Sequence, residues 1–263
     1  MAFYLTLPSN SSMDFYPSNT PSHYFTNLSQ GINLTGDFEV GLSEILISNT
    51  YRNIEEQDEC FFKCVRTETV PNQNNPQLTR LVSKTVVVPP GLYESNEFFI
   101  NTLNTLTVQE LGRQENNKPR VRFFYHKATK QVSVLVYEGT VTLSEKLQSV
   151  LSLNTQTIVG HRHVKGEGAI NLNQDFQSVY IYCDLVSPRP VGDTMAPLLR
   201  IIPILDKKRE VLRFIFEKPH YTPLSRFQFN TVEMILTTDK GKTLSFTSGT
   251  TITTLHFRRR RED

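Results

Sequence analysis

The sequence predicts an all-β protein, an antiparallel β-sandwich of the single jelly-roll type with one or two inserted helices. Valine, isoleucine, threonine and aromatic residues are plentiful, with 17 Phe and 10 Tyr, and these residues suit the pleated, half-buried surface of a sheet. The 14 Pro and 12 Gly fall mostly between short apolar runs, where turns are expected. Strand-like and helix-like segments do not alternate along the chain, which disfavours a parallel α/β fold. Short strands at such spacings are typical of sandwiches and jelly rolls.

Alternating apolar residues predict the individual strands. In residues 37–47, Phe38, Val40 and Leu42 fall on one face, as in a half-buried strand. A tight turn is expected at Asp239–Lys240–Gly241, within a hairpin. The other predicted strands are 3–7, 60–70, 80–88, 120–126, 131–137, 178–186, 198–205, 210–217 and 251–257. Residues 156–177 are expected to form loops.

Two helices are predicted between these strands. Ser95 is a plausible N-cap for a helix over about 96–111, where leucine and phenylalanine recur at steps of three and four residues. A second, short helix is expected at 144–151. These helices indicate a possible helical insertion at 94–151 within one domain that spans 1–263.

Composition excludes several classes of protein. The formal net charge is +2, and Arg258–Arg261 with Glu262 and Asp263 form a charged tail at 258–263. Taking these four basic and two acidic residues from totals of 28 and 26 leaves 24 of each sign. Such a neutral body argues against a broad nucleic-acid-binding surface. No apolar run approaches the roughly 20 residues of a membrane helix, so no membrane insertion is expected.

The three cysteines are expected to be free thiols. Cys60 and Cys64 share one face of a predicted strand, but their Cα atoms would lie about 13 Å apart, too far for a disulfide. Cys183 lies in a strongly apolar strand and is predicted to be in the core. The first residues do not resemble a signal peptide. We therefore expect a soluble protein made in a reducing compartment.

Residues that could carry chemistry are sparse. His161 and His163 flank Arg162, but no third or fourth metal ligand is evident nearby, so an exposed polar loop is the simpler interpretation. Gly166 and Gly168 form only a fragment of a phosphate-binding loop. No hydrolase or zinc-protease motif occurs. The sequence thus predicts no catalytic residue, no metal site and no cofactor.

Several stretches resemble a known family. The sequence is similar to proteins carried by Polinton/Maverick elements and adintoviruses, with Phe38 at a position where Trp is expected as often. The stretches that carry this resemblance are 3–45, with YPSNT at 16–20 and the run at 34–45, then 179–204 and 236–260.

The resemblance implies a structural virion protein. It implies the minor capsid, or penton, protein of an icosahedral particle, a single jelly roll that forms pentamers at the vertices. Its partners would be copies of itself and a double-jelly-roll major capsid protein. Its location would be the virion, assembled in the host cytoplasm or nucleus. The family supplies no catalytic residue.

Two segments are candidates for contact with partners. An N-terminal arm over 1–30 is expected, and its polar part at 8–30 would cross onto a neighbouring subunit and gain order there. The candidate subunit-contact residues are Tyr16, Pro17, Asn19 and Thr20. The candidate contacts to a polyanion or an acidic partner are Arg258, Arg259, Arg260 and Arg261. Four charges alone would give weak, salt-sensitive nucleic-acid binding, which many copies could multiply.

Three other functions remain open from the sequence. A ligand- or glycan-binding attachment sandwich is favoured by the many Tyr and Phe, although the chain contains no Trp. Another shell or cement component of the same particle is possible, but 263 residues are few for two tandem jelly rolls. A cupin-like enzyme would need a cluster of histidine and carboxylate ligands.

Overall fold

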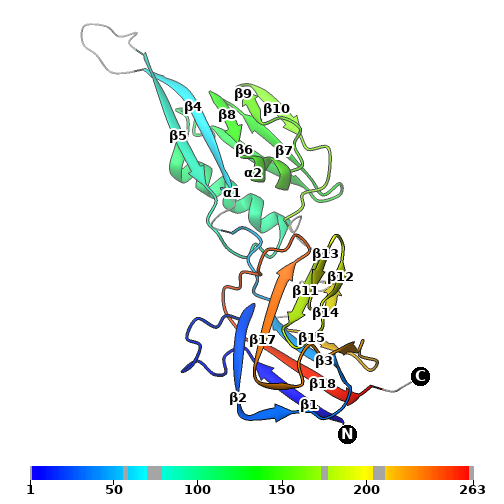
Figure 1. Ribbon diagram of the computed structural model, residues 1–263. Coiled ribbons are helices and arrows are strands. Elements are labelled where there is room, and N and C mark those ends of the chain that lie inside the picture. Colours follow the sequence, from blue (N-terminus) through cyan, green and yellow to red (C-terminus); the bar gives the residue numbers. More distant parts are fainter. Residues whose placement is uncertain (1, 56–58, 70–78, 173–176, 204–210, 261–263) are drawn as a thin grey trace. The chain divides into compact units, whose positions relative to one another are not determined.

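The computed structural model describes residues 2–55, 59–69, 79–172, 177–203 and 211–260. The chain divides into two compact units (Figure 1). Unit 1 comprises Met1–Arg52 and Asp175–Asp263, and unit 2 comprises Asn53–Gln174. Unit 2 is therefore inserted into the sequence of unit 1. Each unit has its own hydrophobic core.

Unit 1 is built from two antiparallel sheets. The first has the order β1 (Ala2–Pro8), β18 (Thr251–Arg259), β3 (Phe38–Ser48) and β15 (Val211–Ile215), with β16 (Thr222–Pro223) also paired to β3. The second has the order β14 (Leu198–Pro203), β11 (Ser178–Cys183), β17 (Gln228–Thr238) and β2 (His23–Asn33). A small hairpin pairs β12 (Arg189–Val191) with β13 (Thr194–Ala196).

The order of these strands along the chain is that of a jelly roll. β1, β3, β15 and β18 belong to the first sheet, whereas β2, β11, β14 and β17 belong to the second. Among these eight strands, the chain crosses from one sheet to the other at every step except from β11 to β14. Eight strands in two four-stranded layers are the jelly-roll arrangement. The predicted fold class is confirmed.

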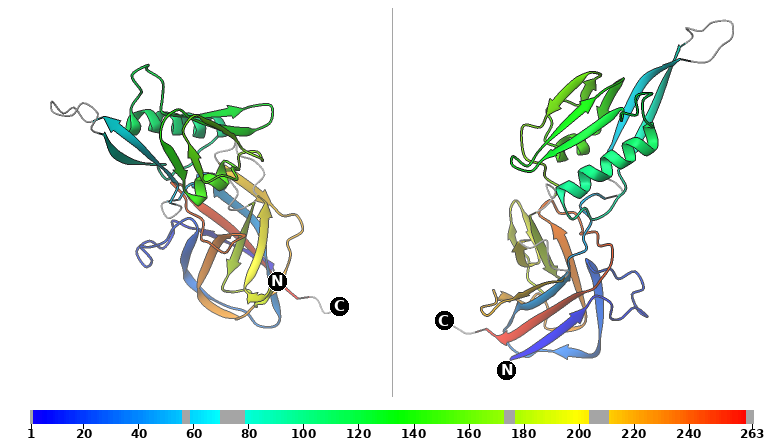
Figure 2. Two further views of the ribbon diagram at one scale, coloured as in Figure 1. Left: turned by 90° about the horizontal axis from the view of Figure 1, so that it is seen from above. Right: turned by 180° about the vertical axis from the view of Figure 1, so that it is seen from behind.

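The core of unit 1 lies between the two sheets. Phe257 of β18 is fully buried, and its ring stacks on Phe3 with a centroid distance of 4.7 Å and on Phe229 at 6.0 Å. The buried Tyr24 hydroxyl of β2 bonds Thr253 Oγ1 of β18 at 2.7 Å, across the sandwich. Burial raises the pKa of Tyr24 well above its ordinary value. β1 runs antiparallel to β18, so the two ends of the described chain lie side by side (Figure 2).

Unit 2 contains two further antiparallel sheets and both helices. One sheet has the order β5 (Thr79–Val87), β4 (Phe61–Thr69), β8 (Thr140–Leu143) and β9 (Thr157–Val159). The other has the order β10 (Arg162–Lys165), β7 (Gln131–Val136) and β6 (Val121–His126). The helices are α1 (Asn96–Leu111) and α2 (Glu145–Val150).

Helix α1 begins and ends as the sequence predicted. The Ser95 side chain caps the N-terminus by accepting a hydrogen bond from the backbone N–H of Phe98. Gly112 follows the last turn with φ 69°, a backbone conformation that glycine adopts readily. The last turn carries no basic residue of its own. Instead, Arg66 and Arg120 both donate to the Leu111 carbonyl, at 3.1 and 3.2 Å, and balance the partial negative charge there.

Asn104 fixes α1 to the outer strand β6. Its side-chain amide accepts from the Phe123 N–H at 2.9 Å and donates to the Phe123 carbonyl at 2.9 Å. Both backbone groups lie on the side of β6 that has no neighbouring strand. The Asn104 side chain therefore pairs the backbone groups of Phe123 that a further strand of the sheet would otherwise pair.

The structure differs from the sequence predictions in three places. Residues 156–177 were expected to be loops, but they include β9 and β10, which are too short to show a period in the sequence. The turn at Asp239–Lys240–Gly241 occurs, but the described residues after it do not form the second strand of the expected hairpin. Only isolated contacts near Thr243 and Leu244 join them to β17. Unit 2 extends beyond the expected insertion at 94–151 at both ends.

Within the described residues, neither helix combines the length and apolar character needed to cross a membrane.

Replacing Asn104 with leucine is expected to destabilise unit 2 by about 1–3 kcal/mol, because a backbone donor and acceptor of Phe123 lose their partners. Hydrogen exchange of the β6 and α1 amides measures this change. Asn101→Leu is the control, since Asn101 is exposed on α1 one turn earlier. Equal protection in the two variants would contradict the role given to Asn104.

Candidate interaction surfaces

The predicted contact residues at 16–20 lie in a loop between β1 and β2. The Asn19 amide accepts from the Phe25 N–H at 2.9 Å and donates to the Phe25 carbonyl at 2.8 Å. Phe25 lies on β2, the last strand of its sheet. Thr20 Oγ1 accepts from the His23 N–H at 3.0 Å, and the Tyr16 ring packs on Phe25 with a centroid distance of 5.2 Å. The loop is thus ordered against its own chain.

The expected arm at 1–30 therefore contains elements of the jelly roll itself. β1 pairs with β18, and β2 pairs with β17. Order at 8–30 does not need a neighbouring subunit, because Asn19 and the Ser12 hydroxyl tie the loop to β2. A contact of Tyr16, Pro17, Asn19 and Thr20 with another subunit stays a prediction.

The arginine tail is partly integrated into the first sheet. Arg258 Nε donates to Glu39 Oε1 at 2.6 Å, and its guanidinium lies 3.5 Å from the centroid of the Tyr221 ring. Because its guanidinium is both paired with a carboxylate and stacked on a ring, Arg258 contributes little free charge to the surface. It holds the end of β18 against β3.

The next arginines are more exposed. Arg259 is the last residue of β18, and the Arg260 N–H bonds the Asp37 carbonyl at 2.9 Å. Arg261 lies outside the described residues. Arg259 and Arg260 are therefore the described members of the tail that present charge to solvent, and contact with a polyanion stays a prediction.

His256 lies at the centre of an aromatic cluster on the outer face of the first sheet. Its ring packs on Tyr4 with a centroid distance of 4.5 Å, and its Nδ1 is 2.7 Å from the Tyr221 hydroxyl. Gly41 is the cross-strand partner of His256, and a Cβ there would lie 2.9 Å from Pro219 Cβ. Only glycine lets the chain at 219–221 approach β3 so closely. Burial and, second, the charge of Arg258 lower the pKa of His256.

The histidine pair lies at the surface, and the three cysteines lie in the two cores. His161 and His163 are exposed, although His163 belongs to strand β10. Among the residues that the structure describes, no group of three or more potential metal ligands occurs. Cys60, Cys64 and Cys183 are buried and form no disulfide, and burial raises the pKa of Cys183 to about 12.

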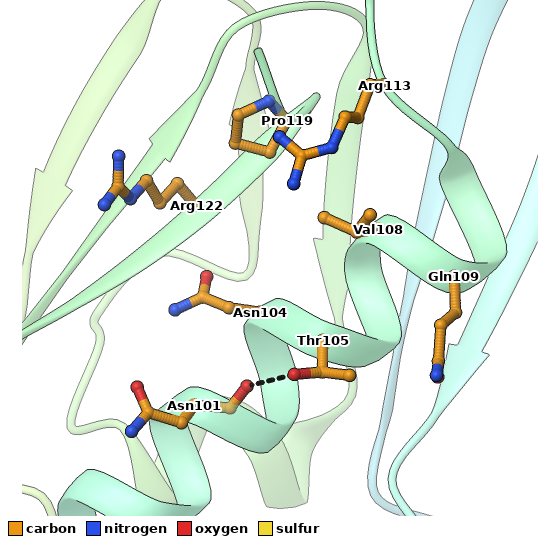
Figure 3. Close-up of a pocket in the computed structure, with 8 residues that line it drawn as sticks. All are labelled: Asn101, Asn104, Thr105, Val108, Gln109, Arg113, Pro119 and Arg122. Carbon is orange, nitrogen blue, oxygen red and sulfur yellow. Dashed lines mark hydrogen bonds between the residues drawn. The ribbon is translucent and has the colours of Figure 1, made fainter. Parts of the chain in front are cut away.

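Sequence reasoning did not find a polar pocket on unit 2. It has a volume of about 640 Å³ and lies beside the second half of α1 (Figure 3). Its residues come from the outer face of the helix, the following loop and β6, and they form no motif that could have marked them. The lining residues are Asn101, Asn104, Thr105, Val108, Gln109, Arg113, Pro119 and Arg122.

Replacing His256 with phenylalanine is expected to weaken the dependence of stability on pH. The folded-state pKa lies below the unfolded value of about 6.5, so the unfolded chain takes up this proton first as the pH falls. Wild-type protein should therefore lose more unfolding free energy than the variant between about pH 7.5 and 5.5. Urea titrations across this range measure the two slopes, and parallel slopes would show that His256 has no part in the effect.

The comparisons with known proteins identify the fold. The crystal structure of the selenomethionine-labelled mavirus penton protein superposes with a TM-score of 0.53 at 9% sequence identity. The match covers 98% of this chain and 99% of that chain. No family model matches the sequence, and no curated protein matches it. The chain therefore shares the fold of that penton protein, and its assignment to the Polinton/Maverick and adintovirus family stays a prediction.

Proposed function

We propose that this chain is a structural capsid protein, and that five copies form the penton at each vertex of an icosahedral shell. The observation that carries the proposal is the fold match over nearly the full length of both chains, inserted unit included. The mavirus protein is by its name a penton protein. A jelly roll needs neither a cofactor nor chemistry to make such a ring, since identical head-to-tail contacts close it.

The side of unit 1 that ends in β14 and β15 supports lateral contact between copies. These are the outer strands of the two sheets. They carry exposed apolar side chains, including Ile201 on β14, Val211 (48% exposed) and Ile215 (59% exposed) on β15. Exposed apolar residues on an outer strand favour association with another chain. We assign this side of unit 1 to the contact between neighbouring subunits.

The wider roles follow from this assignment. As a penton, the protein would lie in the virion beside a major capsid protein, and assembly would take place in the host cytoplasm or nucleus. Arg259 and Arg260 would add weak, salt-sensitive contact to nucleic acid or an acidic partner. A cement or other shell role predicts a different symmetry, so the number of subunits distinguishes it.

The wild-type chain is expected to form rings of five copies, which native mass spectrometry and electron microscopy of the purified protein would detect. A strict monomer at high concentration, or a three-fold assembly, would contradict the penton role.

Val211→Asp and Ile215→Asp are expected to weaken self-association at least about tenfold, because each buries a charge in an apolar contact. Val159→Asp is the matched control, since Val159 is 54% exposed but belongs to unit 2. Sedimentation over a concentration series compares the three variants. Loss of the ring in the Val159 variant alone would contradict the assignment to unit 1 and place the contact surface on unit 2.

A further inference from the structure

We propose that the pocket beside α1 binds saccharides that carry a carboxylate or sulfate group. The site lies wholly in unit 2 and consists of residues that the capsid role does not use. The inference goes beyond that role and stands without it.

Arg113 supplies a fixed cationic group at the pocket. Its Nη1 donates to the Asn117 carbonyl at 2.9 Å, and its backbone forms a β-bridge with Pro119. In Figure 3 its guanidinium extends over Val108, into the space between the helix and the loop. A guanidinium held in this way loses little entropy on binding, and its remaining N–H groups can form two parallel bonds to a carboxylate or sulfate.

Arg122 adds a second positive charge from the other side. It projects from β6, and its guanidinium lies 4.9 Å from the centroid of the Phe124 ring. The eight lining residues include these two arginines and no carboxylate. Asn104 closes the wall between them, because its amide is already bound to the backbone of β6. The pocket therefore attracts anions.

The helix contributes neutral groups suited to sugar hydroxyls. Asn101, Thr105 and Gln109 are exposed and spaced by four residues, so they lie along one face of α1. The Asn101 and Gln109 amides both donate and accept, as hydroxyl recognition requires. The Thr105 hydroxyl already donates to the Asn101 carbonyl at 3.0 Å, so it is left to accept. Val108 and Pro119 add a small apolar surface for a ring face or an acetyl group. The volume of about 640 Å³ suits a mono- or disaccharide.

Nucleic acid fits this lining less well. Single-stranded nucleic acid is bound by stacking of bases on aromatic side chains in a long positive groove. The lining has no aromatic residue and only two positive charges. A ligand with one anionic group and several hydroxyls matches the pocket better.

Binding can be tested with the full-length chain by calorimetry and saturation-transfer NMR. The probes are 3′-sialyllactose, N-acetylglucosamine 6-sulfate and neutral lactose, so carboxylate and sulfate are examined separately. At least one acidic probe is expected to bind, more weakly as salt increases, whereas lactose is not. Equal binding of lactose, or no binding of either acidic probe at millimolar concentration, overturns the proposal.

Variants locate the site. Arg113→Gln and Arg122→Gln should each weaken binding at least about tenfold, which corresponds to about 1.4 kcal/mol. Arg113→Lys should bind the saccharide more tightly than Arg113→Gln and so restore part of the lost affinity. Arg80→Gln is the control, because Arg80 is 68% exposed in the same unit but outside the pocket. Thermal melting checks that each variant folds, and Arg122→Gln keeps the Arg113 anchor intact.

The variants also separate this inference from the capsid role. Arg113→Gln should leave the number of subunits unchanged, since assembly is assigned to unit 1. Unchanged saccharide binding in both glutamine variants overturns the proposed site. Competition by a short single-stranded oligonucleotide that binds more tightly than either saccharide would assign the pocket to nucleic acid and overturn it as well.

Discussion

The backbone groups of the outer strands set the main constraint on this fold. A sheet with free edges leaves N–H and C=O groups that must find partners, or the edge becomes a site of association. Two asparagine side chains meet this need on outer strands, and a third does the same in a connecting segment outside the strands, each by bonding both backbone groups of a single aromatic residue. The pairs are Asn19 with Phe25, Asn104 with Phe123 and Asn53 with Tyr93. Each pair fastens a loop, a helix or a connecting segment to its unit.

These contacts determine which edges stay available. Asn19 and its loop cover part of the outer side of β2, and Asn104 with α1 covers β6. β14 and β15 carry the exposed side chains of Ile201, Val211 and Ile215 on strands that no such loop covers, whereas the exposed Phe15 of the other side lies in the loop itself. The two sides of the jelly roll thus differ, and such a difference suits a head-to-tail contact, in which each subunit presents unlike surfaces to its two neighbours.

The sequence predicted the parts of the fold that local chemistry determines. The bounds of α1 follow from Ser95, the apolar spacing and Gly112, all within one segment. The β6–β7 hairpin follows in the same way from two alternating runs. Both depend on neighbours in the chain, so single-sequence reasoning was sufficient.

Contacts between residues that are far apart in the sequence determine the features that the sequence did not predict. Arg258 is a surface charge by sequence, but Glu39 and Tyr221, both distant along the chain, take it into the sheet. Strands β9 and β10 have three and four residues, and only their partners β8 and β7 make them strands. The pocket beside α1 gathers polar residues from three elements, so no spacing in the sequence marks it.

The insertion would allow one chain to combine the two proposed roles. Unit 2 enters after β3 and leaves before β11, which belong to different sheets of the jelly roll, and it has a core of its own. A domain inserted in this way can change its surface without disturbing the sheets that hold its ends. Arg113 and Val211 lie in separate units, so the effects of changing them on ligand binding and on assembly should add independently. Assembly would then constrain the residues of unit 1, and unit 2 would be free to vary with the ligand.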